Sequence, residues 1–348
     1  MKNKLLALGM ALTIGATLLT GCGDNKDNTS TQVERKYSVV CTTFPQYDWM
    51  RELIGEEREN FDLTLLLDNS VDLHSYQPTA EDIAKIASAD LFVYGGGTSE
   101  SWVEHALEES INKEMKVVNL MEALGDAVKE EEVVEGMQES EHEHEEDHGH
   151  YEEEHEHEEE HENEEAGAVE QDEHVWLSIK NASALVEVLA ETLEQVDPEH
   201  EAVYEANEEA YLSKLSQLDQ QYKEAVDGAI TKTILFGDRF PFRYLTDDYG
   251  LSYYAAFVGC SADTEASFET ITFLAEKVDE LGLGTILVLE GSDQKIAETI
   301  RAASKGKDQE ILQMNSIQSV IYKDIEGGFT YLKAMEDNLE VLKKAINN

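Results

Sequence analysis

Residues 37–43 read YSVVCTT, and three similar apolar runs follow along the chain: FDLTLLL (61–67), LFVYGGG (91–97) and KVVNL (116–120). Amphipathic stretches separate these runs, and strand-helix alternation of this kind predicts a parallel sheet with helices on its faces. A second series predicts another such sheet: TILF (233–236), SYYAAF (252–257), TILVLE (285–290) and EILQM (310–314). The expected fold class is α/β, with two parallel-sheet lobes.

The amphipathic stretches predict helices over residues 79–87, 99–109 and 325–346. Between the two series, Asp197 and Pro198 form a cap and first-turn signature for a long helix over 199–226. That helix would be about 40 Å long at the standard helical rise. We expect an N-terminal lobe over 36–196, a rigid connecting helix over 197–228 and a C-terminal lobe over 229–348.

The first 22 residues have the form of a secretory signal that ends in a lipobox. Two lysines precede an apolar stretch over residues 5–19, and Leu-Thr-Gly-Cys follows at residues 19–22. An apolar stretch of about 15 residues falls short of the ~20 that a spanning helix needs, which disfavours a transmembrane anchor. We expect a signal peptide over 1–21, acylation of Cys22 and a polar tether over 22–35. The mature chain would be extracytoplasmic, held to membrane lipid at the outer face of the cell membrane through Cys22.

Between Lys129 and Lys180 the chain has no lysine or arginine, and 23 acidic residues lie from Glu130 to Glu173. The formal net charge of −49 effectively excludes nucleic acid as a partner. The periodicity is lost here, and we expect a disordered insertion over 129–171. Imidazole is a preferred ligand of zinc, so the segment predicts an accessory metal-binding insertion, although the glutamates alone could serve only solubility. Its histidines are His142, His144, His148, His150, His155, His157 and His161.

Two further cysteines remain after Cys22. Cys41 and Cys260 lie in different halves of the chain. Outside the cytoplasm they could form a disulfide, remain inert buried thiols, or act as metal-binding thiolates. The sequence leaves these three alternatives open.

Two histidines outside the insertion have more particular surroundings. His74 lies in DLHSYQPT, just beyond the expected strand 61–67, at the sheet edge where open α/β sheets bind ligands. His174 lies in DEHVWLS at the expected start of a long helix, with Asp172 close enough to accept a hydrogen bond from one ring nitrogen. We interpret these two histidines as candidate metal ligands.

These motifs carry a family resemblance over nearly the whole mature chain. The segments Asp72–Pro78 (DLHSYQP) and Asp172–Ser178 (DEHVWLS) resemble the two ligand motifs of substrate-binding lipoproteins from zinc and manganese ABC transporters, the ZnuA or TroA-like group. The zinc-type branch often carries a histidine-rich insertion before the second motif. The resemblance implies two lobes joined by a rigid helix, a metal ion between them, an ABC transporter permease as partner, and no organic cofactor.

The C-terminal lobe departs from the family pattern, in which a histidine or glutamate and often an aspartate complete the site. The corresponding segments read LFGDRFPFRYL and QMNSIQSV, without a histidine. Oxygen or sulfur ligands, or a histidine from the insertion, would have to take their place. The candidates are Asp238, Glu290, Asn315 and Cys260.

The sequence therefore predicts a monomeric, non-enzymatic lipoprotein that captures Zn²⁺ and delivers it to a permease. Alternatives are a manganese or iron binder (Mn²⁺ replacing Zn²⁺), a surface protein acting in cell adhesion, and, least favoured, an extracellular zinc enzyme. The metalloprotease pattern HExxH occurs at residues 144–148 and 157–161, but low-complexity sequence produces it by chance.

Overall fold

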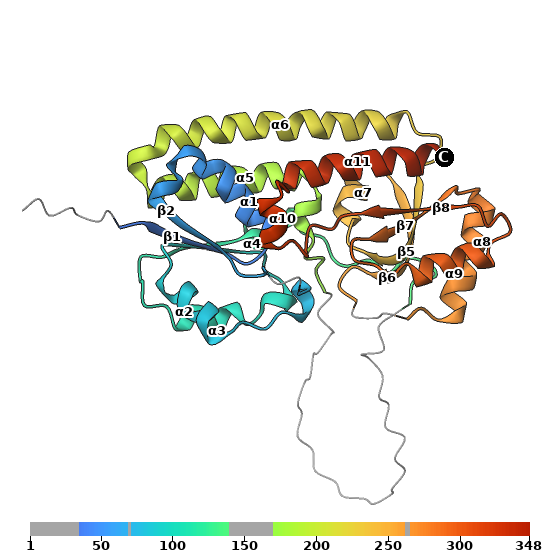
Figure 1. Ribbon diagram of the computed structural model, residues 1–348, viewed down its shortest axis with the longest axis horizontal. Coiled ribbons are helices and arrows are strands. Elements are labelled where there is room, and N and C mark those ends of the chain that lie inside the picture. Colours follow the sequence, from blue (N-terminus) through green and yellow to red (C-terminus); the bar gives the residue numbers. More distant parts are fainter. Residues whose placement is uncertain (1–34, 69–70, 139–169, 262–264) are drawn as a thin grey trace, which may run out of the picture. The chain divides into compact units, whose positions relative to one another are not determined.

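The computed structural model describes residues 35–68, 71–138, 170–261 and 265–348. Within the unit from Lys36 to Asn348, two four-stranded sheets are each fully parallel (Figure 1). Their strand orders are β2-β1-β3-β4 and β6-β5-β7-β8, so the two sheets repeat one topology. The predicted α/β fold with two parallel-sheet lobes is confirmed.

The first sheet and its helices come from the N-terminal half of the chain and from the segment after residue 170. The strands are β1 (Tyr37–Cys41), β2 (Phe61–Leu65), β3 (Leu91–Tyr94) and β4 (Lys116–Asn119), and the helices are α1 (Phe44–Ile54), α2 (Ala80–Ser88), α3 (Val103–Glu108), α4 (Leu120–Leu124) and α5 (Ile179–Val196). Thr79 caps α2 by accepting a hydrogen bond from the Asp82 amide, which fixes the direction of the chain after the loop that holds His74.

The second sheet follows the long helix. Its strands are β5 (Thr233–Phe240), β6 (Ser252–Val258), β7 (Thr285–Leu289) and β8 (Glu310–Met314). The helices in this part of the chain are α7 (Arg243–Tyr249), α8 (Phe268–Leu281), α9 (Lys295–Ala303), α10 (Tyr322–Glu326) and α11 (Tyr331–Asn347). Of these, α10 lies beside the first sheet (Figure 1), where the Tyr322 hydroxyl accepts a hydrogen bond from the Leu65 amide of β2 (3.1 Å). Strand β5 contains a bulge, because Phe236 pairs with Ala255 while Arg239 pairs with Phe257. A bulge redirects the side chains that follow it, and Arg239 is one of them.

The long helix α6 (Glu201–Asp227) packs against α1 and α5 at one end and against α7 and α11 at the other (Figure 1). A short 3-10 turn, Pro198–His200, precedes it, so the α-helix begins two residues later than the sequence predicts. No helix of the described residues is long and apolar enough to cross a membrane.

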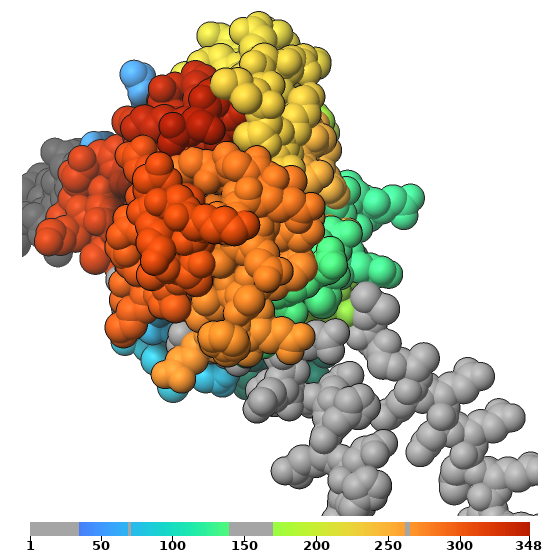
Figure 2. Space-filling view, turned by 90° about the vertical axis from the view of Figure 1, so that its right-hand side faces the viewer, coloured from blue at the N-terminus to red at the C-terminus, as the bar shows by residue number. Residues whose placement is uncertain are grey.

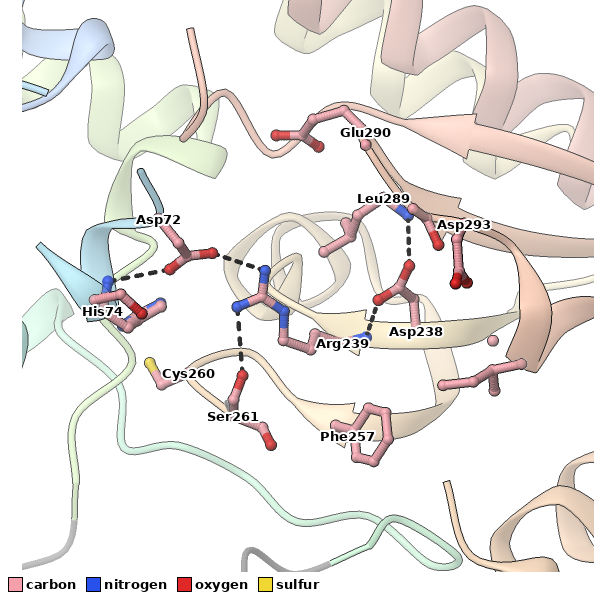
Figure 3. Close-up of a pocket in the computed structure, with 15 residues that line it drawn as sticks. Asp72, His74, Asp238, Arg239, Phe257, Cys260, Ser261, Leu289, Glu290 and Asp293 are labelled. Carbon is pink, nitrogen blue, oxygen red and sulfur yellow. Dashed lines mark hydrogen bonds and ion pairs between the residues drawn. The ribbon is translucent and has the colours of Figure 1, made fainter. Parts of the chain in front are cut away.

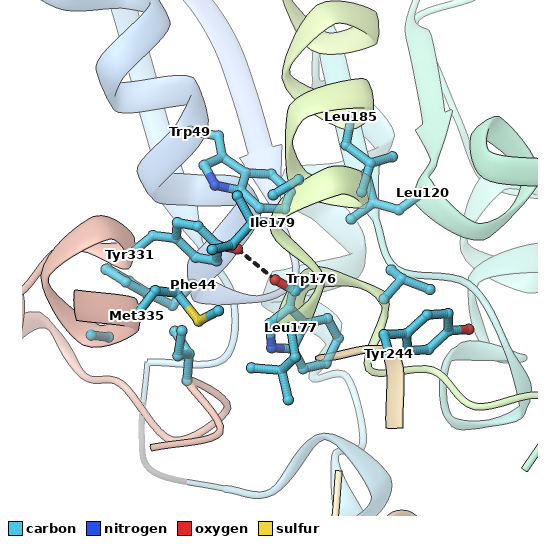
Figure 4. Close-up of a cluster of buried hydrophobic side chains, with 14 of the residues drawn as sticks. Phe44, Trp49, Leu120, Trp176, Leu177, Ile179, Leu185, Tyr244, Tyr331 and Met335 are labelled. Atoms are coloured by element: carbon cyan, nitrogen blue, oxygen red, sulfur yellow. Dashed lines mark hydrogen bonds between the residues drawn. The ribbon is translucent and has the colours of Figure 1, made fainter. Parts of the chain in front are cut away.

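One continuous apolar core connects the two sheets. Trp176 lies at its centre, where its indole donates a hydrogen bond to the Ser316 carbonyl (2.9 Å) and its own carbonyl accepts one from the Tyr331 hydroxyl (2.6 Å) (Figure 4). Tyr331 in turn donates its backbone N–H to Asp48 of α1. The segment next to His174 is therefore fixed to both halves of the molecule.

Two sequence predictions differ from the structure. The predicted helix over 325–346 is two helices, because α10 ends at Glu326 and the chain turns at Gly328, whose φ of +90° favours glycine. The disorder predicted over 129–171 is wrong at both ends: Glu130 pairs with Gln171, and the Gln138 amide donates to the Ala256 carbonyl at 3.0 Å. Residues 139–169 lie outside the described residues. The green segment that ends at Gln138 lies against the orange C-terminal part of the chain in Figure 2.

Candidate metal centre

Two imidazoles and one thiol converge at the carboxyl edges of the sheets. His74 lies in the 3-10 turn Leu73–Ser75 after β2, His174 directly precedes the 3-10 turn Val175–Leu177, and Cys260 follows β6. One ligand atom from each lies within 4.8 Å of the others. His74 and Cys260 follow the second strand of their respective sheets, so they occupy equivalent positions of the repeated topology.

Each imidazole has one nitrogen fixed and the other free. Nδ1 of His74 lies 2.7 Å from the Ser99 hydroxyl, and Nδ1 of His174 lies 2.9 Å from a carboxylate oxygen of Asp172. Both Nε2 atoms are buried and have no hydrogen-bond partner. The two ring centroids are 5.3 Å apart. This is the arrangement that metal-binding histidines adopt, with the second nitrogen oriented by a hydrogen bond.

The two D-x-H motifs share one local hydrogen bond, from the histidine amide to the aspartate two residues earlier. Asp72 accepts a hydrogen bond from the His74 amide (3.1 Å), and Asp172 accepts one from the His174 amide (2.9 Å). A carboxylate that binds the backbone two residues further on stabilises a tight turn. His174 therefore begins a turn, and α5 starts five residues later instead of at His174 as predicted.

The neutral state of the His74 imidazole favours metal binding. Burial, together with the neighbouring His174, lowers the pKa of His74 to about 3. Its imidazole is therefore neutral near neutral pH, as a metal ligand must be. Glu173 lies beside it: one carboxylate oxygen accepts a hydrogen bond from the Ser99 amide (2.8 Å), the other lies 3.5 Å from Nδ1 of His74, and burial raises the pKa of this carboxyl group.

Cys260 is held in a constrained loop. Its amide donates to Glu131 (2.9 Å), and burial raises the pKa of its thiol. A Cβ atom on Gly259 would lie 3.0 Å from the His174 ring, so the loop contacts the imidazole directly. Cys41 is buried in β1, and both thiols are free, so the disulfide alternative is wrong.

Arg239 connects the loops that carry His74 and Cys260. Its guanidinium donates to Asp72 (2.8 Å) and to the carbonyl of Ser261 (3.3 Å) (Figure 3). Burial opposes the ionisation of Asp72, but Arg239 and His74 together outweigh burial and lower the pKa of this carboxyl group. These residues line a cavity of about 520 Å³.

The other C-terminal candidates are engaged elsewhere. Asp238 lies in the β5 bulge and accepts hydrogen bonds from the amides of Arg239 and Leu289, beyond Arg239 from His74 (Figure 3). Glu290 accepts from the Ser316 amide (2.7 Å), and the side-chain oxygen of Asn315 accepts from the Ile317 amide (2.7 Å). None of the three joins the converging group, because these bonds stabilise the turns after β7 and β8 and the bulge. The seven insertion histidines lie outside the described residues.

Sequence reasoning missed four residues that shape the site: Ser99, Glu131, Glu173 and Arg239. Ser99 follows β3, and the carboxyl ends of parallel strands meet at one edge, so its position beside His74 could have been inferred. Glu131 and Arg239 gave no such signal, because their roles depend on the ordered start of the insertion and on the bulge in β5.

Comparisons with known proteins show which proteins the chain resembles. Residues 39–345 match the protein family described as "Zinc-uptake complex component A periplasmic". The chain is 31% identical to zinc-binding lipoprotein AdcA of Streptococcus pneumoniae over 94% of its own length and 58% of that protein, so it spans little more than half of this relative. It is 30% identical to the high-affinity zinc uptake system protein ZnuA of Bacillus subtilis over 94% of both chains.

A solved structure extends the likeness to the fold. The Zn(II)-bound ZnuA-like domain of Streptococcus pneumoniae AdcA superimposes with a TM-score of 0.66 at 27% identity, covering 90% of this chain and 100% of that one.

Proposed function

This chain belongs to the zinc-uptake complex component A family, and from this premise we propose that it binds a zinc ion at His74 and His174 and delivers the ion to an ABC-type permease. The single observation that supports the site most strongly is the pair of buried, unpartnered Nε2 atoms whose opposite ring nitrogens are already fixed. Imidazole nitrogen suits zinc, whereas manganese prefers sites rich in oxygen.

The names of the relatives support zinc as the cargo. The AdcA and ZnuA relatives are described as zinc-binding or as part of a zinc uptake system, and zinc is bound in the similar structure. A component of an uptake system requires a membrane permease as its partner. We extend both properties to this chain, together with a lipid anchor at Cys22, an extracytoplasmic location, a monomeric state and the absence of enzymatic activity.

The two-lobe arrangement explains how an ion is held and released. The histidines come from the N-terminal half and Cys260 from the C-terminal half, so a small relative movement of the two loops would open the site. The histidine-rich insertion, whose ordered start ends at Gln138 on β6, would collect zinc weakly and raise its concentration near this site.

Calorimetric titration of the metal-stripped full chain with zinc, and separately with manganese, tests this proposal. We expect one tight zinc site and several weaker ones, with manganese binding much more weakly. A variant that lacks residues 139–165 should keep the tight site and lose the weaker ones. The double variant His74→Ala, His174→Ala should lose the tight site.

The matched control is His105→Ala, which removes an exposed imidazole on α3 that lies beside Glu108. It should bind zinc as the unmodified chain does. Unchanged tight binding in the double variant would disprove the location of the site, and loss of the tight site on deletion of 139–165 would place zinc in the insertion.

A further inference from the structure

We infer that the C-terminal half supplies a thiolate, Cys260, as the third metal ligand, and that the site is therefore built for thiophilic ions such as zinc and cadmium and against manganese. This inference rests on the proposed function and specifies its ligand chemistry. In the described part of the chain, one group of histidine, cysteine and acidic side chains can converge on an ion, and it consists of His74, His174 and Cys260.

Three contacts from different elements place the Cys260 thiol. The Cys260 amide is held by Glu131 from the start of the insertion, and the Ser261 carbonyl next to it is held by Arg239 of β5. Gly259 lets the backbone approach the His174 ring so closely that a Cβ atom would lie 3.0 Å from it. The thiol is thus fixed beside two unpartnered imidazole nitrogens, and in Figure 3 it lies on the side of Arg239 that faces His74.

The nearby carboxylates lie outside the converging group. Asp172 binds Nδ1 of His174 and Asp72 binds Arg239. Glu173 binds the Ser99 amide with one oxygen, and its other oxygen lies beside Nδ1 of His74 at 3.5 Å. Glu290 and Asp238 are bound to backbone amides, as described above. An ion held by the converging group would meet two nitrogens and one sulfur. Soft thiolate ligands select zinc and similar ions, whereas manganese favours carboxylates, carbonyls and water.

The binding step is a ligand exchange without oxidation or reduction. As the sulfur-metal bond forms, the S–H bond of Cys260 breaks and its proton passes to solvent. A thiolate replaces the neutral thiol, so the bound group gains one negative charge beside the divalent cation.

Cobalt(II) titration of the metal-stripped full chain reads the sulfur ligand directly, because a cobalt-thiolate bond gives a charge-transfer absorption band that imidazole and carboxylate ligands do not give. The chain has three cysteines, Cys22, Cys41 and Cys260, and the histidine-rich insertion has none, so cobalt bound to the insertion cannot produce this band. We expect the band to appear with the first equivalent of cobalt. It should persist in Cys41→Ala, which removes the free thiol buried in β1, and disappear in Cys260→Ser.

Competition titrations then measure selectivity. Cys260→Ser should lower cadmium affinity at least about 100-fold and change manganese affinity only a few-fold. Loss of a residue that hydrogen-bonds to a metal ligand lowers affinity by up to about 100-fold, and loss of the ligand itself should cost at least as much. If the unmodified chain binds zinc tightly through His74 and His174 but gives no charge-transfer band, the thiolate inference is wrong and the proposed function stands. If the unmodified chain has no tight zinc site, both are wrong. If Cys260→Ser folds poorly, the presence or absence of the charge-transfer band in the unmodified chain still tests the thiolate ligand.

Discussion

Asp72 and Asp172 use their carboxylates differently although both bind the backbone amide of the histidine two residues later. Asp172 also binds Nδ1 of that histidine, whereas Asp72 binds Arg239 from the other sheet. Asp172 is therefore suited to orienting His174, and Asp72 to joining the two halves. His74 takes its Nδ1 partner from Ser99 instead.

Asp172→Asn tests the orienting role. An amide oxygen still accepts the His174 N–H, but the negative charge that makes this imidazole a better metal ligand is lost. We expect calorimetric titration to show zinc affinity about 10- to 100-fold lower, the usual effect of losing a residue that hydrogen-bonds to a metal ligand.

The matched control for Asp172→Asn is Glu290→Gln, which changes a carboxylate that lines the same cavity but binds Ser316. Its zinc affinity should stay within about threefold of the unmodified chain. Equal losses in both variants would show that general cavity charge, not orientation of His174, governs affinity.

Glu100 predicts a particular pH dependence of stability. Burial raises the pKa of this carboxyl group to about 7 from its usual 4.5, although the Gly96 amide donates to it at 2.8 Å. The folded state therefore holds more protons than the unfolded state between these values, so the contribution of Glu100 to stability falls as pH rises from 4.5 to 7. This difference between the folded and unfolded pKa of Glu100 corresponds to about 3 kcal/mol in the free energy of unfolding.

Glu100→Gln removes this titration. Urea unfolding at pH 5 and at pH 8 should show the variant gaining stability relative to the unmodified chain by about 2–3 kcal/mol between the two values. The two proteins would have parallel stability curves if the buried carboxyl group did not titrate in this range.

At the scale of elements, the contact between the loop after β2 and the loop after β6 depends on Arg239. The Arg239–Asp72 pair is about one-quarter exposed on each side. A partly exposed, charge-assisted bond of this kind contributes about 1 kcal/mol. Arg239→Gln should accelerate amide hydrogen exchange about fivefold in residues 72–76 and 258–261 of the metal-free protein.

A double-mutant cycle with Asp72→Asn isolates the pair. Asp72→Asn should have the same effect as Arg239→Gln, and the combined variant should exchange no faster than either. The control is Lys223→Gln, which breaks the exposed Lys223–Asp227 pair within α6 and should leave both loops unchanged. Additive effects of Arg239→Gln and Asp72→Asn would show that the pair does not join the loops.

Apolar periodicity in the sequence was sufficient to predict the strands, because strands buried on both faces require continuous apolar runs. It was not sufficient at Gly327 and Gly328, where the apolar pattern continues across a turn that divides the last predicted helix. It also failed at residues 130–138, whose acidic composition indicates disorder while their hydrogen bonds to β6 keep them ordered.

At the site too, the sequence predicts what depends on local residues and misses what depends on contacts with distant ones. His74 and His174 could be proposed as ligands from short motifs, because the hydrogen bond between the aspartate and the histidine amide forms within each motif. Of the four candidate ligands that the sequence offers in the C-terminal half, the structure places Cys260 beside the two histidines. Local sequence around Asp238, Glu290 and Asn315 does not reveal which backbone amides they bind, and these bonds are what separates them from Cys260.

At the scale of the whole molecule, one core spans both sheets, and Trp176 binds Ser316 and Tyr331 beside the site. We therefore expect metal-free protein to unfold in a single cooperative transition in calorimetry. Zinc should raise the free energy of unfolding by about 2.7 kcal/mol at a free concentration 100 times the dissociation constant. Two separate transitions would mean that the halves unfold independently.

The most direct test of the central claim is anomalous diffraction at the zinc absorption edge, from crystals of the full chain loaded with one equivalent of zinc. We predict a single strong peak between Nε2 of His74 and Nε2 of His174, about 2.0–2.1 Å from each. A peak elsewhere, or none at this position while zinc remains bound, would contradict the account.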